Sequence, residues 1–253
     1  MQVRDIAALV TGGGSGLGEA TARALAADGA RVAILDRNIA AAQAVAADIG
    51  ALAIDCDVTG AEAAEAAVAQ AGDAHGPARI LVNCAGVGPA QKILGRKGLM
   101  PLEDFRKVVE INLIGSFNML RLFVAQAAGL DPLASGERGV VINTASIAAY
   151  DGQIGQTAYA ASKGGVVGLT LPAARELAAL AIRVVTIAPG LFGTPMLRAL
   201  PQEAQDSLSA SVPFPARLGE PAEYADLVRY ILSAEMLNGE VIRLDGSLRM
   251  APR

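Results

Sequence analysis

The stretch AALVTGGGSGLG, residues 7–18, places a short apolar run directly before a glycine-rich loop. An alanine-rich segment, Glu19 to Asp28, then predicts a helix, and Arg31 to Asp36 predicts a second strand. Strand, glycine loop, helix and strand form the first βαβ unit of a doubly wound sheet. Such glycines let the backbone turn tightly and approach a pyrophosphate at the helix N-terminus. The alternative is a glycine-rich connection without a ligand, but the strand and helix on either side favour a dinucleotide site.

The alternation of strands and helices continues along the chain. Further helices are expected at residues 40–49, 61–71, 103–109, 113–128, 155–177 and 221–232, and further strands at 52–56, 80–82, 140–144, 182–188 and 239–245. No linker, repeat or low-complexity segment interrupts this pattern. We therefore expect one domain, residues 1–253, with the α/β fold of a Rossmann-type doubly wound parallel sheet and helices on both faces.

Two segments break the alternation. Residues 87–101 combine glycines and prolines with the cations Lys92, Arg96 and Lys97, and are expected to form an irregular surface loop. Residues 197–215 are richer in polar side chains than their surroundings. They are expected to form a mobile lid over a substrate.

The composition excludes several classes of protein. Hydrophobic residues make up 53% of the chain and charged residues 18%, which suits a large core and excludes a disordered chain. The net charge of −4 gives no basic surface for nucleic acid or for an anionic membrane. No uninterrupted apolar run approaches the ~18–20 residues of a membrane span. A strand is expected almost at once, which leaves no room for a targeting peptide, so we expect a cytoplasmic protein.

Cysteine and histidine offer no metal site. Cys56 and Cys84 lack the paired spacing of zinc ligands and are expected in the core, without a disulfide. The single histidine, His75, lies in a Gly-Asp-Ala-His-Gly-Pro segment that predicts a solvated turn. Catalysis that depends on histidine is therefore not expected.

A serine, a tyrosine and a lysine lie close together in the segment SIAAYDGQIGQTAYAASK, residues 146–163. On a helix, the spacing of Tyr159 and Lys163 places both side chains on one face. A phenol with a pKa near ~10 is a poor base at neutral pH, and a nearby ammonium lowers that pKa. Ser146 follows the predicted strand 140–144, at the edge of the sheet where ligands bind. The alternative is an ordinary half-buried helix face, but together with the upstream glycine loop the set predicts proton transfer to or from an alcohol oxygen.

Two further residues bear on the site. Asp36 ends the second predicted strand, where a carboxylate accepts hydrogen bonds from ribose hydroxyls and repels a 2′-phosphate. This favours NAD over NADP, although Arg37 beside it leaves NADP open. Asn112 falls at the junction of two predicted helices, where its amide competes with the backbone. We expect a local irregularity there that exposes a carbonyl to a bound water.

Several motifs occur in order and together resemble the short-chain dehydrogenase/reductase family in its tetrad form. They are Thr-Gly-x-x-x-Gly-x-Gly at 11–18, Asp57-Val58, Asn83-Cys84-Ala85-Gly86, Asn112, Ser146, Tyr159-x-x-x-Lys163 and PGLFGTPM at 189–196. The resemblance covers essentially residues 3 to 251. The chain departs from the usual pattern at Cys84, where a second asparagine is usual.

The resemblance implies a role for each matched position. Tyr159 transfers the proton, Ser146 positions the substrate oxygen, and Lys163 lowers the tyrosine pKa and holds the nicotinamide ribose. Asn112 orders a water that links Lys163 to solvent. Gln153, with Ser146 and Tyr159, falls near the substrate. Cofactor contacts are implied at Gly12, Ser15, Gly16, Leu17, Gly18, Asp36, Asp57, Val58, Cys84, Ala85, Gly86, Tyr159, Lys163, Pro189, Phe192 and Thr194.

Within the family, longer segments such as GVVINTASIAAYDGQIGQTAYAASKGGVVGLTLP resemble enzymes that oxidise 3-hydroxyacyl-CoA thioesters with NAD. Such enzymes are homotetramers, which implies pairing of the long helices predicted at 113–128 and 155–177. Oxidation of a steroid or another secondary alcohol is an alternative, because a shared fold does not settle the substrate. An NAD-binding scaffold or partner subunit is an alternative from another class, which the intact catalytic set disfavours. The cations of residues 87–101 are expected either to contact the CoA phosphates or simply to be solvated.

Overall fold

A seven-stranded parallel sheet forms the centre of the molecule in the computed structural model, which describes residues 1–96 and 98–252. The strand order is β3-β2-β1-β4-β7-β8-β9. The bounds are β1 Ala7–Thr11, β2 Arg31–Asp36, β3 Leu52–Asp55, β4 Ile80–Asn83, β7 Gly139–Thr144, β8 Ile182–Pro189 and β9 Val241–Leu244. This confirms the predicted fold class.

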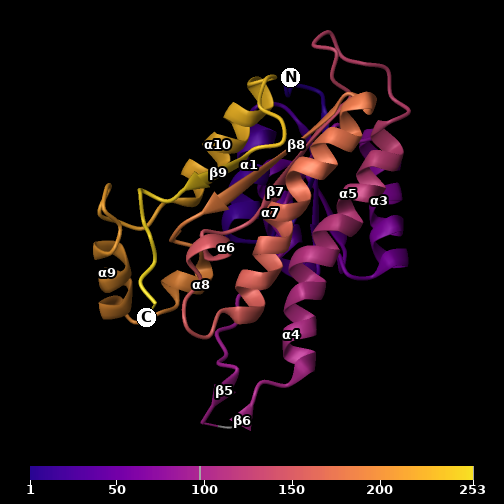
Figure 1. Ribbon diagram of the computed structural model, residues 1–253. Helices are drawn as coiled ribbons and strands as arrows, with labels where there is room; N and C mark the ends of the chain where they lie inside the picture. Colours follow the sequence, from indigo (N-terminus) through magenta and orange to yellow (C-terminus); the bar gives the residue numbers. More distant parts are fainter. Residues whose placement is uncertain (97, 253) are drawn as a thin grey trace.

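Helices cover both faces of the sheet. One face packs on α1 (Gly16–Ala27), α2 (Ile39–Ile49) and α10 (Pro221–Ser233). The other packs on α3 (Ala61–His75), α5 (Gly115–Ala127) and α7 (Thr157–Leu177), which lie side by side in Figure 1. Strands buried on both faces need nearly continuous apolar sequences, and β4, β7 and β8 are buried at every residue. This is why the strands are recognisable in the sequence.

The strand order reverses at β1, which pairs with β2 on one side and with β4 on the other. The loops that leave β1 and β4 therefore run apart at the carboxyl edge of the sheet and open a crevice there. Gly12 has a φ of +64°, and a Cβ on it would lie 2.8 Å from the Ala85 backbone. Only glycine therefore allows the two loops this close approach.

A π-helical turn interrupts the long helical region at the predicted junction. α4 (Leu102–Val109) continues through the turn Glu110–Ile114 into α5. The span Leu102–Ala127 is long and apolar enough to cross a membrane by length and composition, because it contains an 18-residue stretch with a mean hydropathy of 1.4. Half of that stretch is buried inside the fold, and core helices of globular proteins often meet the same criterion.

Two of the expected loops contain regular structure. Within residues 87–101, β5 (Leu94–Gly95) and β6 (Gly98–Leu99) form a small antiparallel hairpin that projects beyond α4 (Figure 1). Strands this short carry no alternating pattern, so the sequence does not reveal them. Lys97 lies outside the described residues. The expected lid carries α8 (Pro195–Arg198) and α9 (Gln202–Ala210), and a short α6 (Ala148–Asp151) follows Ser146.

The prediction of a solvated turn at His75 is wrong. α3 continues through this residue, which is partly buried, and its Nε2 has no hydrogen-bond partner among the described residues. The helix ends because Gly76, with a φ of +78°, takes a conformation that other residues seldom adopt. The glycine marks the end of a helix rather than the middle of a turn.

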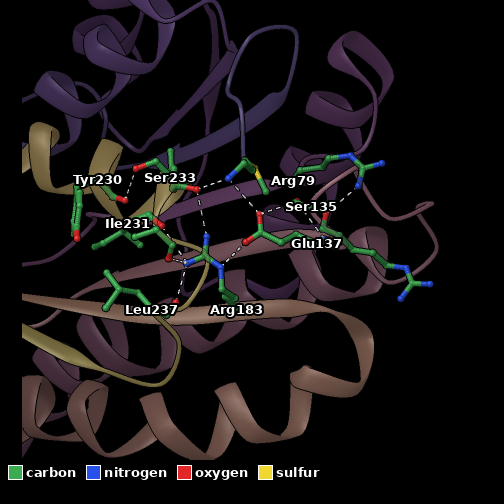
Figure 2. Close-up of polar contacts among 12 residues, drawn as sticks. Arg79, Ser135, Glu137, Arg183, Tyr230, Ile231, Ser233 and Leu237 are labelled. Carbon is green, nitrogen blue, oxygen red and sulfur yellow. Dashed lines mark hydrogen bonds and ion pairs between the residues drawn. The ribbon is translucent and has the colours of Figure 1, made fainter.

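A buried ion pair anchors the end of the sheet opposite the crevice (Figure 2). Arg183, near the start of β8, pairs with Glu137, and both side chains are more than nine-tenths buried. The Arg183 guanidinium also donates to the carbonyl oxygen of Leu237, at 2.8 Å. Buried charges are tolerated when they are paired and hydrogen-bonded in this way. The pair fixes β8 against the chain that leaves α10.

Candidate active site

A cavity of about 310 Å³ lies in the crevice at the strand-order reversal. The glycine loop after β1 forms one wall, and a Cβ on Gly18 would collide with the Gly12 carbonyl oxygen. The N-terminus of α1 opens into the cavity, which suits a pyrophosphate. Among the predicted cofactor contacts, those that line it are Gly12, Ser15, Gly16, Leu17, Gly18, Asp36, Asp57, Val58, Cys84, Ala85, Gly86 and Thr194. The shape and lining therefore fit a dinucleotide.

Two carboxylates occupy the end of this cleft. The Asp36 Oδ2 accepts a hydrogen bond from the Gly14 amide at 3.0 Å, and its Oδ1 accepts one from the Asn38 amide at 2.9 Å. Both oxygens are thereby held at the end of β2. Hydrogen bonds from the Thr59 backbone and hydroxyl lower the pKa of Asp57. Arg37, the neighbour of Asp36 in the sequence, lines the same cleft.

A second cavity of about 310 Å³ continues from the first and contains the catalytic candidates Ser146, Tyr159 and Lys163. Cys84 and Thr194 line both cavities, so the two are contiguous. Pro189 and Phe192, predicted to contact the cofactor, line this second cavity too. Ser146 is buried, and its Oγ accepts a hydrogen bond from the Ala148 amide at 3.1 Å. This hydrogen bond holds the Ser146 hydroxyl in place at the cavity wall.

Tyr159 and Lys163 lie on neighbouring turns of α7, as the spacing predicts. The Lys163 Nζ lies 6.0 Å from the centre of the Tyr159 ring and donates to the Thr144 carbonyl oxygen at 2.7 Å. Burial lowers the pKa of Lys163 to about 8. Burial also raises the pKa of Tyr159, against the opposite effect of the Ser146 hydroxyl. The net shift is therefore opposite to the lowering expected from Lys163, and burial is its largest cause.

Asn112 lies behind the catalytic cavity rather than in its wall. Its side chain is fully buried, exchanges two hydrogen bonds with the Val87 backbone and donates to the Ser162 hydroxyl at 2.9 Å. The backbone carbonyl oxygen of Asn112, within the π-helical turn, accepts a hydrogen bond from the Ser116 hydroxyl at 2.7 Å. The asparagine thus ties the irregular turn to the loop after β4 and to α7. Its ordering of a water stays a prediction.

The structure does not bring Gln153 into the cavity. Its Nε2 donates to the Ala251 carbonyl oxygen at 2.9 Å, so it holds the C-terminal segment instead. Two residues that the sequence analysis does not single out, Gln156 and Met250, line the catalytic cavity. Met250 follows the last strand by several residues, so its place depends on the path of the tail (Figure 1). No local pattern in the sequence predicts that path.

The sequence also does not predict a buried network of polar groups beneath the catalytic cavity. The Tyr224 hydroxyl, on α10, lies 2.7 Å from the Thr144 hydroxyl and 3.8 Å from the Cys84 sulfur. The Thr144 hydroxyl in turn donates to the Cys84 sulfur at 3.6 Å, which closes a ring of three polar groups. The Thr144 carbonyl is also the acceptor for Lys163. The one signal in the sequence is a tyrosine within the apolar stripe of a helix.

A dinucleotide cleft that opens into a cavity with a serine, a tyrosine and a lysine defines an oxidoreductase that uses a nicotinamide cofactor. The chain belongs to the short-chain dehydrogenase family. The model of that family, described as short chain dehydrogenase, matches residues 6–205 of the chain. This confirms the family resemblance and makes the protein an enzyme of that class.

Individual relatives share the whole chain. The 3-hydroxyacyl-CoA dehydrogenase type-2 of Bos taurus is 49% identical over 99% of this chain and 97% of its own. The protein of the same name from Drosophila melanogaster is 49% identical over 99% of this chain and 100% of its own.

Solved structures agree with these relatives. The crystal structure of 3-hydroxyacyl-CoA dehydrogenase type-2 from Mycobacterium avium matches with a TM-score of 0.94 at 44% identity, over 98% of both chains. The 3-ketoacyl-(acyl-carrier-protein) reductase from Brucella melitensis, complexed with NADH, matches with a TM-score of 0.86 at 32% identity, over 98% of this chain and 100% of its own.

Proposed function

We propose that the protein is an NAD-dependent dehydrogenase that interconverts 3-hydroxyacyl-CoA and 3-oxoacyl-CoA thioesters. The observation that carries the proposal is the cavity that joins Ser146, Tyr159 and Lys163 to the dinucleotide cleft. The substrate class is supported by relatives about half identical to this chain that are named 3-hydroxyacyl-CoA dehydrogenase.

The residues divide the work on the substrate oxygen. The Tyr159 phenolate takes the proton of the alcohol during oxidation, and the Tyr159 phenol gives a proton to the carbonyl oxygen during reduction. Ser146 donates a hydrogen bond to the same oxygen. Lys163 keeps a positive charge beside the phenolate that forms. The nicotinamide, when bound, accepts or supplies the hydride.

The substrate class is tested by comparing the CoA thioester with simpler carbonyl compounds. We expect acetoacetyl-CoA to be reduced with a kcat/KM at least about a hundredfold higher than that of free acetoacetate, because the CoA part adds binding contacts. Consumption of NADH measures both rates, and a panel of oxosteroids runs beside them. Equal efficiency with acetoacetate, or higher efficiency with a steroid, would overturn the thioester as the substrate class and favour another secondary alcohol.

Selection of NAD over NADP is proposed to rest on Asp36. Its two oxygens are held at the end of β2, where they meet the ribose hydroxyls of NAD and repel the 2′-phosphate of NADP. We expect Asp36→Ala to shift the ratio of kcat/KM values toward NADP by at least about tenfold, or about 1.4 kcal/mol. Asp55, the partner of Asp36 in the register of β3 with β2, is exposed and outside the cleft, so Asp55→Ala is the matched control. A wild-type enzyme that uses NADP equally well would show that Arg37 overrides the carboxylate.

The two directions of the reaction are expected to differ in their pH dependence. Burial raises the pKa of Tyr159, so the phenol stays protonated through the neutral range. Oxidation needs the phenolate, whose fraction grows about tenfold per pH unit below the pKa, so kcat/KM for oxidation should rise steeply from about pH 6 to about pH 9. Reduction needs the phenol, which stays protonated over that range, and its kcat/KM should not rise. Initial rates in both directions measure this, and an oxidation rate independent of pH would contradict the role of Tyr159.

A homotetramer and a cytoplasmic location stay predictions. The exposed apolar side chains Phe117 on α5 and Leu171 on α7 support pairing of these helices between subunits, together with Ile114 in the π-helical turn. Light scattering at micromolar concentration measures the assembly.

A further inference from the structure

A third cavity, of about 510 Å³, lies between α4 and the segment that leaves β4. Val87 lines this groove and both cavities of the candidate active site, and Gly88 lines the groove and the catalytic cavity. A Cβ on Gly88 would lie 3.4 Å from the Tyr159 ring, so this end of the groove reaches the reacting position. The groove is thus a second path from the catalytic cavity to the surface.

The outer part of the groove is positively charged. Arg37, from the end of β2, and Lys107, on α4, both line it, and Asp104 is the carboxylate among its lining residues. Within residues 1–96 and 98–252, neither Arg37 nor Lys107 forms an ion pair, whereas the neighbouring Arg106 pairs with Glu103. The two cations are therefore available to a ligand, in a chain whose net charge is −4.

Apolar side chains line the rest of the groove, with Gly88 and Gln91 beside them. They are Val87, Pro89 and Val108. The Val87 amide is already bound to Asn112, and Pro89 has no amide hydrogen. A flexible, mostly apolar arm fits this wall, and a polyanionic end fits the two cations beyond it.

We propose that this groove binds the substrate's coenzyme A part, with Arg37 and Lys107 on its phosphates and the pantetheine arm along Val87 and Pro89. This inference rests on the proposed function and places the nucleotide end of the thioester in the groove. Lys92 and Arg96, for which the sequence suggests the same role, are exposed and line none of the three cavities. The proposed phosphate contacts therefore lie on α4 and just after β2 rather than at Lys92 or Arg96.

Lys107→Ala tests the proposal with two thioesters that share the same reacting atoms. Acetoacetyl-CoA carries the phosphates, and the acetoacetyl thioester of N-acetylcysteamine lacks them. We expect Lys107→Ala to raise KM for acetoacetyl-CoA about three- to tenfold, because an exposed charge is screened by salt and contributes modestly. Because kcat should stay nearly unchanged, the variant loses binding that the substrate and the transition state share. KM for the truncated thioester should stay the same.

Two variants on α4 sharpen the comparison. Arg106→Ala removes an adjacent cation that is paired with Glu103 and lies outside the groove, so it should leave both KM values unchanged. Asp104→Asn removes the opposing carboxylate, so it should lower KM for acetoacetyl-CoA alone. If Lys107→Ala and Arg106→Ala raised KM for acetoacetyl-CoA equally, the effect would come from general surface charge, and the subsite would be overturned.

The 2′-phosphate of NADP is the other source of phosphate near Arg37. Lys107 does not line the dinucleotide cleft, so Lys107→Ala should leave KM for NAD and NADP unchanged. A rise in KM for NADP without one for acetoacetyl-CoA would assign the groove to the cofactor and overturn the proposal. Equal KM values of the wild-type enzyme for both thioesters would overturn the subsite alone, whereas failure to turn over either thioester would overturn the proposed function itself.

Discussion

Tyr159→Phe is expected to lower kcat by about 10³-fold, within the ~10²–10⁴ that general acid–base catalysis contributes. The substitution removes one oxygen and keeps the ring, which fills the space beside Gly88 and Lys163. Ser146 remains to hold the substrate oxygen, but the phenol that exchanges a proton with this oxygen is gone. Both directions of the reaction should fall together.

Cofactor binding separates this effect from a change of structure. The dinucleotide cleft does not include Tyr159, so the Kd for NADH, measured by fluorescence, should change less than about threefold. Tyr150→Phe is the matched control, because Tyr150 is half exposed on α6, outside both cavities, and should keep full activity. Retention of a substantial part of kcat by Tyr159→Phe would remove the tyrosine from the mechanism.

Lys163→Met should lower kcat by a similar factor and weaken cofactor binding as well. The lysine lies in the catalytic cavity directly against the cofactor cleft, with its Nζ held by the Thr144 carbonyl. Methionine has nearly the same shape but no charge to stabilise the phenolate or to donate to a ribose hydroxyl. We expect at least about a hundredfold loss in kcat and a Kd for NADH raised about tenfold.

The same variant is expected to be no less stable than the wild type near pH 7. Burial lowers the pKa of Lys163 to about 8, so the folded protein disfavours the ammonium relative to the unfolded chain. This destabilisation is fully present below pH 8 and disappears as pH rises through the unfolded pKa of about 10.5. Lys163→Met should therefore raise Tm near pH 7, and the gain should shrink above pH 10. Loss of both activity and Tm would indicate a structural lysine instead, and Lys92→Met, at an exposed position, provides the control.

The sequence predicts most of the fold, because the sheet is buried on both faces. β2 begins and ends where Arg31 to Asp36 predicts, and the long helices are found where their apolar patterns place them. What it misses depends on distant contacts or on very short elements. The strands β5 and β6 have too few residues for a pattern, and His75 belongs to a helix that only the conformation of Gly76 ends.

The sequence predicts which residues gather at the candidate site better than it predicts their pKa values. The sixteen residues that the resemblance implies for the cofactor all line one of the two contiguous cavities, because the motifs follow the carboxyl ends of the strands. Gln153 is the exception among the substrate residues, because its side chain turns to the C-terminal segment. The direction of the Tyr159 pKa shift also differs from the expected one, since a four-residue spacing shows a neighbouring charge but not how deeply the phenol is buried.

The most direct measurement follows the hydrogen that moves. The purified enzyme is mixed with acetoacetyl-CoA and NADH deuterated at the transferring position, and the CoA products are analysed by mass spectrometry. The proposed function predicts 3-hydroxybutyryl-CoA that carries one deuterium at C3, formed in step with the loss of NADH. NADH that binds but is not consumed, with acetoacetyl-CoA recovered unchanged, would contradict the proposed reaction and favour an NAD-binding scaffold or partner subunit.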